Sequence, residues 1–369
     1  MRNAVLIASP GLWHLGHGDT HPLRPERLRR TFELLEAYGV LAAPNVRVVE
    51  PEPATEDQLA LFHTKEYIAG VKALSSGDRS ILPGSYNFGT GDNPVFEGMY
   101  ESESLKAGGA LLAARMLLGR ECDVVFHYGG GLHHAAPDHA SGFCVFNDGG
   151  MAIRWLMRKG LRIAYVDVDV HHGDGVQWAF YDSGRVLTIS LHQSGNTLFP
   201  GTGFVDESGR GAGEGYSVNV PLPPNTNDET YLWAFREIVP PLVRRFEPDI
   251  LVTQLGVDTH YLDPLAELKL TTRGHKAIFS ALDSLGLRWL ALGGGGYNLD
   301  VVPRAWTLAF AAMAGLSLPD ELPESYRAEY GGKWLEDRDG PEIDPVLQSL
   351  VRRRVEEVVA QVKRAHGLR

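Results

Sequence analysis

Short apolar runs alternate with longer amphipathic segments along most of this chain. A run of roughly four to eight apolar residues between polar or glycine residues is typical of a buried strand. The run at residues 5–8 predicts a first strand close to the start of the sequence. Similar runs predict further strands at residues 123–127, 162–168, 185–191, 249–255 and 288–292.

The segments between these runs repeat apolar residues at helical spacing. They predict helices at residues 99–118, 149–159, 228–246, 272–285 and 302–314, and a final helix with basic residues beyond residue 345. Asn227 or Asp228 and Thr271 or Thr272 suit the N-caps of two of these helices. Regular alternation of strand and helix predicts an α/β protein in which helices cover both faces of a parallel sheet.

The chain has 369 residues, of which 44% are hydrophobic, so it can bury a large core. Residues 86–94 and 197–218 are rich in glycine, proline and polar residues, and they predict loops rather than linkers between domains. We therefore expect residues 1–369 to form a single domain, with residues 345–369 as a C-terminal helical extension.

The charge and the cysteine content exclude several classes of protein. A formal net charge of −11 disfavours nonspecific binding to nucleic acid or to anionic membranes, although basic partners are tolerated. No apolar run approaches the roughly 20 residues of a membrane helix, and residues 5–8 are too short for a signal-peptide core, so we expect a cytoplasmic protein. Cys122 and Cys144 are too few for a disulfide framework and are expected to be buried thiols.

Residues 167–174 contain three carboxylates and two imidazoles, directly after the apolar run at 163–166. If the run continues as a strand, Asp167, Asp169 and His171 share one face and valines fill the other. Burying neighbouring carboxylates costs roughly several kcal/mol unless a cation or hydrogen-bond donors compensate. Carboxylates and imidazoles together suit zinc, so the cluster predicts a metal site. The alternative, a solvated acidic strand end, fits the flanking valines poorly.

Distinctive loops follow the predicted strands. They contain residues 129–134, 167–174, 256–258 and 293–297. Ligands of open α/β sheets bind at the carboxyl ends of the strands, so we expect these loops to converge on one site. The glycine runs permit close backbone approach; a phosphate cradle is the competing interpretation, but neither run has the required spacing.

The tandem histidines His133 and His134 point two imidazoles in different directions. Histidines paired with carboxylates make tuned acid–base groups, and Asp167 and Asp174 are the expected partners. The alternative for each histidine, taken alone, is an ordinary packed core residue.

Several of these segments together resemble a known family. In order along the chain, five blocks are similar to the signature blocks of the zinc-dependent histone deacetylases: residues 130–135, 141–144, 167–175, 199–203 and 292–297. The resemblance extends from about residue 21 to residue 306. Within the family, residues 252–265 most resemble the bacterial acetoin-utilisation deacetylases.

This resemblance implies a three-layer arginase/deacetylase fold with an eight-stranded, mainly parallel sheet and helices on both faces. It assigns the zinc ligands to Asp169, His171 and Asp258, with iron(II) as an alternative metal. Three protein ligands leave a position open for water and substrate, as catalytic zinc requires.

The resemblance also implies hydrolysis of the acetyl-lysine amide in a protein, giving lysine and acetate. His134 with Asp174 would be the general base and later the acid, and His133 with Asp167 the electrostatic partner. Tyr297 would donate its hydroxyl to the developing oxyanion. The acetoin-utilisation relatives suggest a role in acetoin or acetate metabolism.

A substrate path follows from the same resemblance. Phe143 and Phe199 match an aromatic pair that walls a tunnel for the acyl-lysine chain, with Gly142 and Leu265 beside them. At the rim, Asp92 matches an acid that holds the substrate backbone amides, the alternative being a surface turn.

Deeper in the site, Arg27 matches a residue of an inner acetate channel, the alternative being a charge at a helix start. Two structural potassium sites are also implied. The first would use Asp167, Asp169, His171, Ser190 and Leu191, and the second Phe180, Ser183 and Val186.

Other activities compete with this interpretation. A binuclear manganese ureohydrolase shares the fold but needs more carboxylates, whereas Gly173 and His260 occupy positions where such a site would need aspartate. An acetylpolyamine amidohydrolase would suit the acidic chain, although Leu265 is not an acidic gatekeeper. A silent acyl-lysine reader is disfavoured because every catalytic position is intact.

Overall fold

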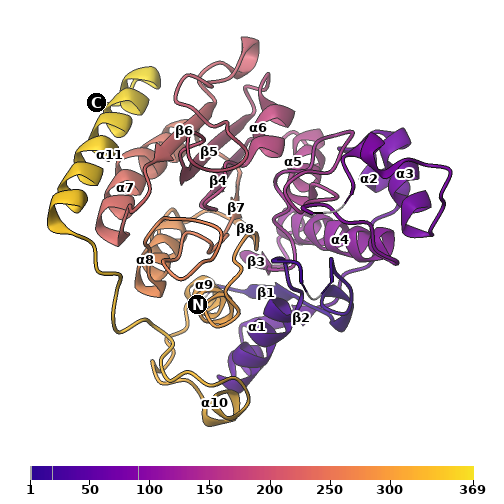
Figure 1. The fold of residues 1–369 in the computed structure, drawn as a ribbon, viewed down its shortest axis with the longest axis horizontal. Helices are drawn as coiled ribbons and strands as arrows, with labels where there is room; N and C mark the ends of the chain where they lie inside the picture. The colour runs from indigo at the N-terminus through magenta and orange to yellow at the C-terminus, as the bar shows by residue number, and fades with distance from the viewer. Residues whose placement is uncertain (1, 19, 90) are drawn as a thin grey trace.

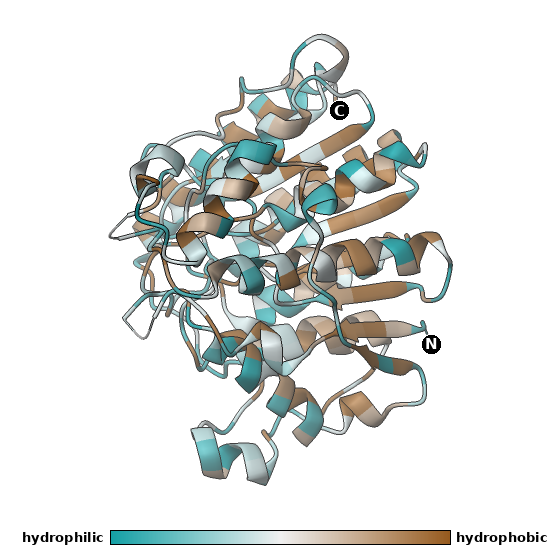
Figure 2. Cartoon of the chain, turned by 90° about the vertical axis from the view of Figure 1, so that its right-hand side faces the viewer, coloured by the Kyte–Doolittle hydropathy of each residue, from teal (hydrophilic) through white to brown (hydrophobic). Residues whose placement is uncertain are grey.

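The computed structural model describes residues 2–18, 20–89 and 91–369. Its centre is a sheet of eight strands in the order β2-β1-β3-β8-β7-β4-β5-β6, and every neighbouring pair is parallel. The strands are β1 Ala4–Ile7, β2 Val46–Val49, β3 Val124–His127, β4 Ile163–Asp167, β5 Val186–Gln193, β6 Ser217–Leu222, β7 Ile250–Gln254 and β8 Trp289–Leu292. They are mostly hydrophobic along their length (Figure 2).

Helices cover both faces of this sheet (Figure 1). The α-helices are α1 Glu26–Ala37, α2 Glu56–Leu59, α3 Lys65–Ser75, α4 Met99–Leu118, α5 Asp148–Arg158, α6 Asp174–Phe180, α7 Asp228–Phe246, α8 Thr272–Asp283, α9 Val302–Ala314, α10 Glu324–Tyr330 and α11 Pro345–Ala365. Short 3₁₀ turns lie at Pro10–Leu12, Val40–Ala42, Pro83–Tyr86 and Gly211–Gly213.

Alternate strand residues enter two different cores, as expected for a sheet buried on both faces. Ala4 and Leu6 of β1 belong to the core shared with α1, α7, α8, α9 and α11. Val5 and Ile7 belong to the core shared with α4, α5 and α6. The predicted three-layer α/β fold is therefore confirmed.

Most of the predicted elements match the structure within two residues at each end. The helices at 99–118, 228–246 and 302–314 have the predicted bounds, and the caps are Asn227 and Thr271, whose side chains accept from Thr230 N and Gly274 N. Cys122 and Cys144 are buried free thiols, as predicted.

Two predictions needed correction. The loop expected at 197–218 ends earlier, because Ser217 and Val218 already belong to β6. The polar residues of β6 suggest a loop, but Asn219 is buried and donates to Gln177 Oε1 over 2.7 Å. In the acidic cluster the strand stops at Asp167, so Asp169 lies in the loop after β4 rather than on a strand face.

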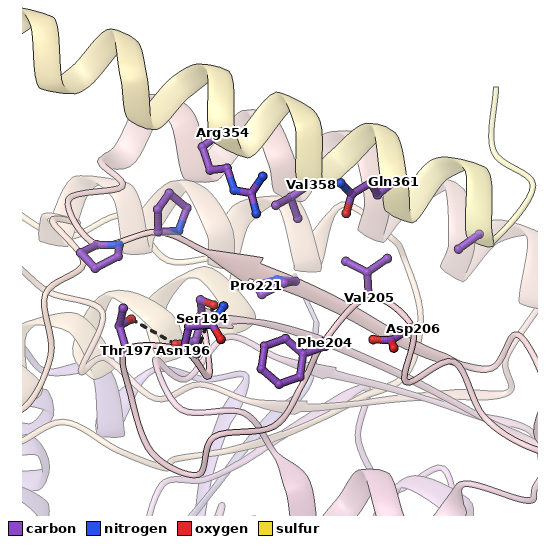
Figure 3. Close-up of a pocket in the computed structure, with 13 residues that line it drawn as sticks. Ser194, Asn196, Thr197, Phe204, Val205, Asp206, Pro221, Arg354, Val358 and Gln361 are labelled. Atoms are coloured by element: carbon purple, nitrogen blue, oxygen red, sulfur yellow. Dashed lines mark hydrogen bonds between the residues drawn. The ribbon is translucent and has the colours of Figure 1, made fainter.

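The C-terminal helix α11 packs on α7 and on the edge strand β6. A pocket of about 590 Å³ opens between α11 and the segment after β5. Arg354 and Val358 of α11 face Phe204 and Val205 of that segment across it (Figure 3). In the part of the chain that the structure describes, no helix is long and apolar enough to span a membrane.

Candidate active site

Two glycine-rich loops meet at the carboxyl ends of β3 and β8. A Cβ atom on Gly131 would lie 2.7 Å from the backbone nitrogen of Gly294, and Gly131 has φ +91°, so only glycine allows this approach. The Asp148 carboxylate fixes the first loop, because it accepts hydrogen bonds from Gly131 N at 3.0 Å and Leu132 N at 2.8 Å. This backbone leads directly into His133 and His134.

Each of these histidines is paired with a carboxylate, which is buried for Asp167 and partly buried for Asp174. His133 Nδ1 lies 2.8 Å from Asp167 Oδ2, and His134 Nδ1 lies 2.6 Å from Asp174 Oδ1. The Nε2 atoms of the two histidines lie 3.0 Å apart, so both rings point toward the same region, and the expectation that they point in different directions was wrong. The Tyr165 hydroxyl also donates to Asp167 Oδ2 over 2.7 Å. The structure therefore brings together the histidine–aspartate pairs that the sequence predicted.

The two imidazoles differ in protonation. Burial opposes the charged form of His133, but the carboxylates of Asp167 and Asp169 outweigh it and raise the pKa of His133 to about 9. Burial and the neighbouring His133 lower the pKa of His134 to about 4. Near neutral pH, His134 is thus a neutral imidazole that can accept a proton, beside a positively charged partner.

The predicted metal ligands form one buried cluster. Ligand atoms of Asp169, His171 and Asp258 all lie within 4.8 Å of one another. His171 Nδ1 is 3.1 Å from Asp169 Oδ1 and 3.1 Å from Asp258 Oδ2. The remaining carboxylate oxygens are used by the protein: Asp169 Oδ2 accepts from Gln254 Nε2 at 2.5 Å, and Asp258 Oδ1 accepts from Val170 N at 2.8 Å.

This cluster fits a divalent cation. Burial, together with the Asp169 carboxylate, raises the pKa of Asp258 to about 8, so a second negative charge is strongly disfavoured there. A cation among the three side chains would remove that penalty. Two carboxylates and one imidazole, each offering one ligand atom, match the ligand set of a catalytic zinc that keeps a position open.

Tyr297 follows the second glycine loop and faces the same region. Its ring lies edge-on to Phe143, with 5.7 Å between the ring centroids. Burial raises the pKa of Tyr297 well above its usual range, so its hydroxyl remains protonated and can donate a hydrogen bond. The buried Arg27 donates to Gly294 O at 2.6 Å and Gly296 O at 3.1 Å, which ties α1 to this loop.

Two of the predicted tunnel residues, Gly142 and Phe199, pack against His134. The ring of Phe199 lies 5.0 Å from that of His134 and is edge-on to it. A Cβ atom on Gly142 would lie 2.4 Å from His134 Cδ2 and 2.9 Å from Phe199, so glycine leaves room between them. Leu265 is partly buried on the loop after β7. The structure thus brings these predicted tunnel residues to the same rim.

The predicted rim acid, Asp92, is exposed. Two neighbouring contacts connect its loop to the aromatic wall. His21 Nε2 lies 3.2 Å from Asp92 O, and Asn93 Oδ1 accepts from Phe143 N over 3.0 Å. The backbone of Asp92 is therefore anchored beside Phe143, and its carboxylate is exposed to solvent at the rim.

The comparison with known families decides between the possible classes of amide hydrolase. The model of the histone deacetylase domain matches residues 21–313, which is most of the chain. The chain belongs to the histone deacetylase family. It is accordingly an enzyme, a metal-dependent amide hydrolase of the deacetylase type.

Relatives within the histone deacetylase family include bacterial and eukaryotic proteins. The acetoin utilization protein AcuC of Bacillus subtilis is 40% identical over 334 residues, covering 88% of this chain and 86% of that protein. Histone deacetylase 8 of Danio rerio is 38% identical over 332 residues, covering 89% and 87%. A crystal structure of an HDAC homolog from Aquifex aeolicus matches with a TM-score of 0.86 at 30% identity, covering 98% of this chain and all of that one.

The residues of the first predicted potassium site lie next to the histidine–aspartate pairs. Asp167 of β4 pairs in register with Ser190 of β5. Ser190 Oγ contacts His192 Nδ1 at 2.8 Å, and Leu191 is buried in the same strand. The second predicted set lies at the turn from α6 to β5, where Ser183 N donates to Phe180 O and Val186 begins β5. Their binding of potassium remains a prediction.

Sequence reasoning missed several residues that hold this site in place. Gln254 is fully buried between Asp169 and Gly256, and Asp263 accepts from Tyr297 N at 2.9 Å. His17 Nε2 lies 3.1 Å from Phe143 O. Gln254 and Asp263 lie within residues 252–265, which resemble the acetoin-utilisation deacetylases, but that resemblance assigned them no role. The local signal is that both flank the loop that contains Asp258.

Proposed function

We propose that the protein is a zinc-dependent deacetylase that hydrolyses the amide of acetyl-lysine in proteins, releasing lysine and acetate. The observation that supports this proposal is the convergence of two histidine–aspartate pairs, one three-ligand metal cluster and Tyr297 below two aromatic rings. Iron(II) is the alternative metal for the same ligands.

The chain supplies the proton transfers of the reaction. Because Asp174 accepts from Nδ1 of His134, the Nε2 atom of His134, which lies 3.0 Å from His133 Nε2, carries no proton of its own and can take one from the attacking water. When bound by Asp169, His171 and Asp258, zinc would polarise the carbonyl and lower the pKa of that water. As the carbon–nitrogen bond breaks, the proton passes to the departing lysine amine. The charged His133 stabilises negative charge throughout.

Tyr297 completes the arrangement. Its protonated hydroxyl donates to the negative charge that develops on the carbonyl oxygen, a charge absent from the bound amide. Phe143 and Phe199 suit the apolar methylenes of a lysine side chain, and Asp92 at the rim suits the backbone amides of a peptide. Arg27, behind Gly294 and Gly296, is proposed to line the path for acetate.

The ureohydrolase alternative fits the structure less well. Across residues 2–18, 20–89 and 91–369, the one group of three or more potential metal ligands is Asp169, His171 and Asp258. His260, at a position where a second metal would need a ligand, instead bonds Asp337 Oδ2 over 2.8 Å. The other ring nitrogen, Nδ1, accepts a hydrogen bond from Leu262 N, so both ring nitrogens of His260 have hydrogen-bond partners within the protein.

The decisive experiment compares two substrate classes. The purified protein is given acetyl-lysine peptides and acetylpolyamines, each with and without a chelator. We expect peptide turnover that the chelator abolishes and added zinc restores. Turnover of acetylpolyamines alone would replace the protein-deacetylase proposal with the polyamine alternative. The similarity to two acetoin utilization proteins supports a role in acetoin or acetate metabolism, and we propose that this role is cytoplasmic.

A further inference from the structure

Three charged side chains hold the loop that ends at Tyr297. Arg27 donates to the carbonyl oxygens of Gly294 and Gly296, and Asp169 Oδ2 accepts from Gly295 N over 2.8 Å. The third is Asp263, whose Oδ2 accepts from Tyr297 N over 2.9 Å. Of these three side chains, only Asp263 forms a hydrogen bond with the tyrosine itself.

Asp263 also holds the opposite rim of the site. It lies on the loop after β7, where its Oδ1 accepts from Leu265 N over 3.0 Å and its own N–H donates to His260 O over 2.9 Å. Its carboxylate is 7% exposed. One buried carboxylate therefore joins the loops after β7 and β8 by using each of its oxygens once.

Burying a carboxylate costs free energy unless hydrogen-bond donors compensate for the water that it loses. The adjacent Gly296 has φ +130°, and the backbone leading to Tyr297 is therefore not restricted by a side chain of its own. A hydroxyl that stabilises a transition state must be held within a fraction of an ångström of its place. Fixing Tyr297 N fixes the start of that side chain.

We propose that Asp263 is a positioning residue that aims the Tyr297 hydroxyl at the acyl carbonyl by anchoring the tyrosine backbone. This inference rests on the proposed function, in which Tyr297 is the hydrogen-bond donor. In the contacts described above, the Asp263 carboxylate bonds only the backbone N–H groups of Tyr297 and Leu265, and it touches no metal ligand. Its contribution to catalysis acts through Tyr297.

The test is a double-mutant cycle on the full chain with an acetyl-lysine peptide. In Asp263→Asn one oxygen becomes an amide that donates, so one of the two backbone N–H groups loses its acceptor. We expect kcat to fall about ten-fold, with KM and metal content within about two-fold of wild type. In a Tyr297→Phe background the same substitution should lower kcat less than about two-fold, because the group it positions is gone.

Asp228 provides a matched control. It is a partly buried carboxylate that accepts a backbone hydrogen bond from Thr271 N at 2.8 Å and a second from Thr271 Oγ1, and among the described residues its side-chain hydrogen bonds involve none of the site. Asp228→Asn should cost comparable stability and leave kcat within about two-fold of wild type.

Equal losses of kcat from Asp263→Asn in both backgrounds would overturn the inference while leaving the proposed function intact. Unchanged kcat in Asp263→Asn would overturn it as well. A Tyr297→Phe variant with wild-type kcat would instead remove Tyr297 from the proposed function, and with it the role of Asp263. If Asp263→Asn does not fold, the same cycle is run with Asp263→Glu. This variant keeps both acceptor oxygens but displaces them, so the same comparison of kcat in the two backgrounds tests the inference.

Discussion

At the scale of single residues, the Tyr297 hydroxyl offers the most direct test of the chemistry. Replacing Tyr297 by Phe removes one hydrogen-bond donor and preserves the ring beside Phe143. We expect kcat to fall by about 10²-fold or more, roughly 2.7 kcal/mol of transition-state stabilisation, with little change in substrate binding. Steady-state kinetics on an acetyl-lysine peptide measures both. A near wild-type kcat would exclude Tyr297 from the mechanism.

A single substitution at Asp92 can distinguish peptide substrates from acetylpolyamines. Its carboxylate is exposed at the rim and can grip peptide N–H groups, each charged hydrogen bond contributing about 1.5 to 3 kcal/mol. Asp92→Ala should therefore lower kcat/KM for peptides by about ten-fold or more. A free acetylpolyamine has no peptide backbone at that point and should be affected much less. Equal losses for both substrates would contradict the protein-deacetylase assignment.

At the scale of elements, the backbone at Gly142 lets its loop pack closely against His134 and Phe199. Gly142 has φ +49°, and an added Cβ would lie within 3 Å of both His134 and Phe199. Gly142→Ala should lower kcat at least about ten-fold, because it displaces the general base or the tunnel wall, while metal content is retained.

The matched control is Gly286→Ala. Gly286 also has a positive φ, +71°, but no atom lies within 4 Å of the added Cβ. It should cost about 1 kcal/mol of stability and leave kcat unchanged. Equal loss of activity in both variants would show that backbone strain, and not the clash with His134, is responsible.

The elements that were predicted correctly are those with an unbroken apolar signal. The central strands β3, β4, β7 and β8 are buried on both faces, so their sequences are continuous apolar runs. The edge strands β2 and β6 lack that signal. Arg47 of β2 faces solvent, and β6 contains buried polar residues whose partners come from α6 and the loop after β5.

The same distinction applies to the site. His133, His134 and the acidic cluster stand in dense local motifs, so the sequence alone identified them and their pairing. Asp263 and Gln254 have hydrogen-bond partners 34 and 85 residues away. Their identity depends on how the strands are ordered in the sheet, and a single sequence does not contain that information.

At the scale of the whole molecule, the metal should couple the site to the stability of the fold. Asp258→Ala should abolish tight metal binding and activity together, because no alternative ligand set was found in the described residues. Elemental analysis should give one divalent metal per wild-type chain. Two tightly bound transition metals would reject this interpretation.

Removing the metal should also lower the melting temperature. Binding to the folded state alone adds about 2.7 kcal/mol when the free metal exceeds its Kd a hundred-fold. A chelator should therefore shift the thermal unfolding of the wild type to lower temperature and leave that of Asp258→Ala unchanged. Calorimetry measures the shift; the same response in both proteins would show that the chelator acts elsewhere.

The order of the strands determines when a newly made chain can acquire its site. β3 lies between β1 and β8, so residues 124–127 lack one of their two neighbouring strands until about 160 more residues have been synthesised. Until β8 emerges from the ribosome, β3 keeps an open hydrogen-bonding edge, and Tyr297 does not yet exist. A chain released before β8 is made thus exposes an aggregation-prone edge and has no activity, so protection by chaperones is needed from the synthesis of β3 until the synthesis of β8.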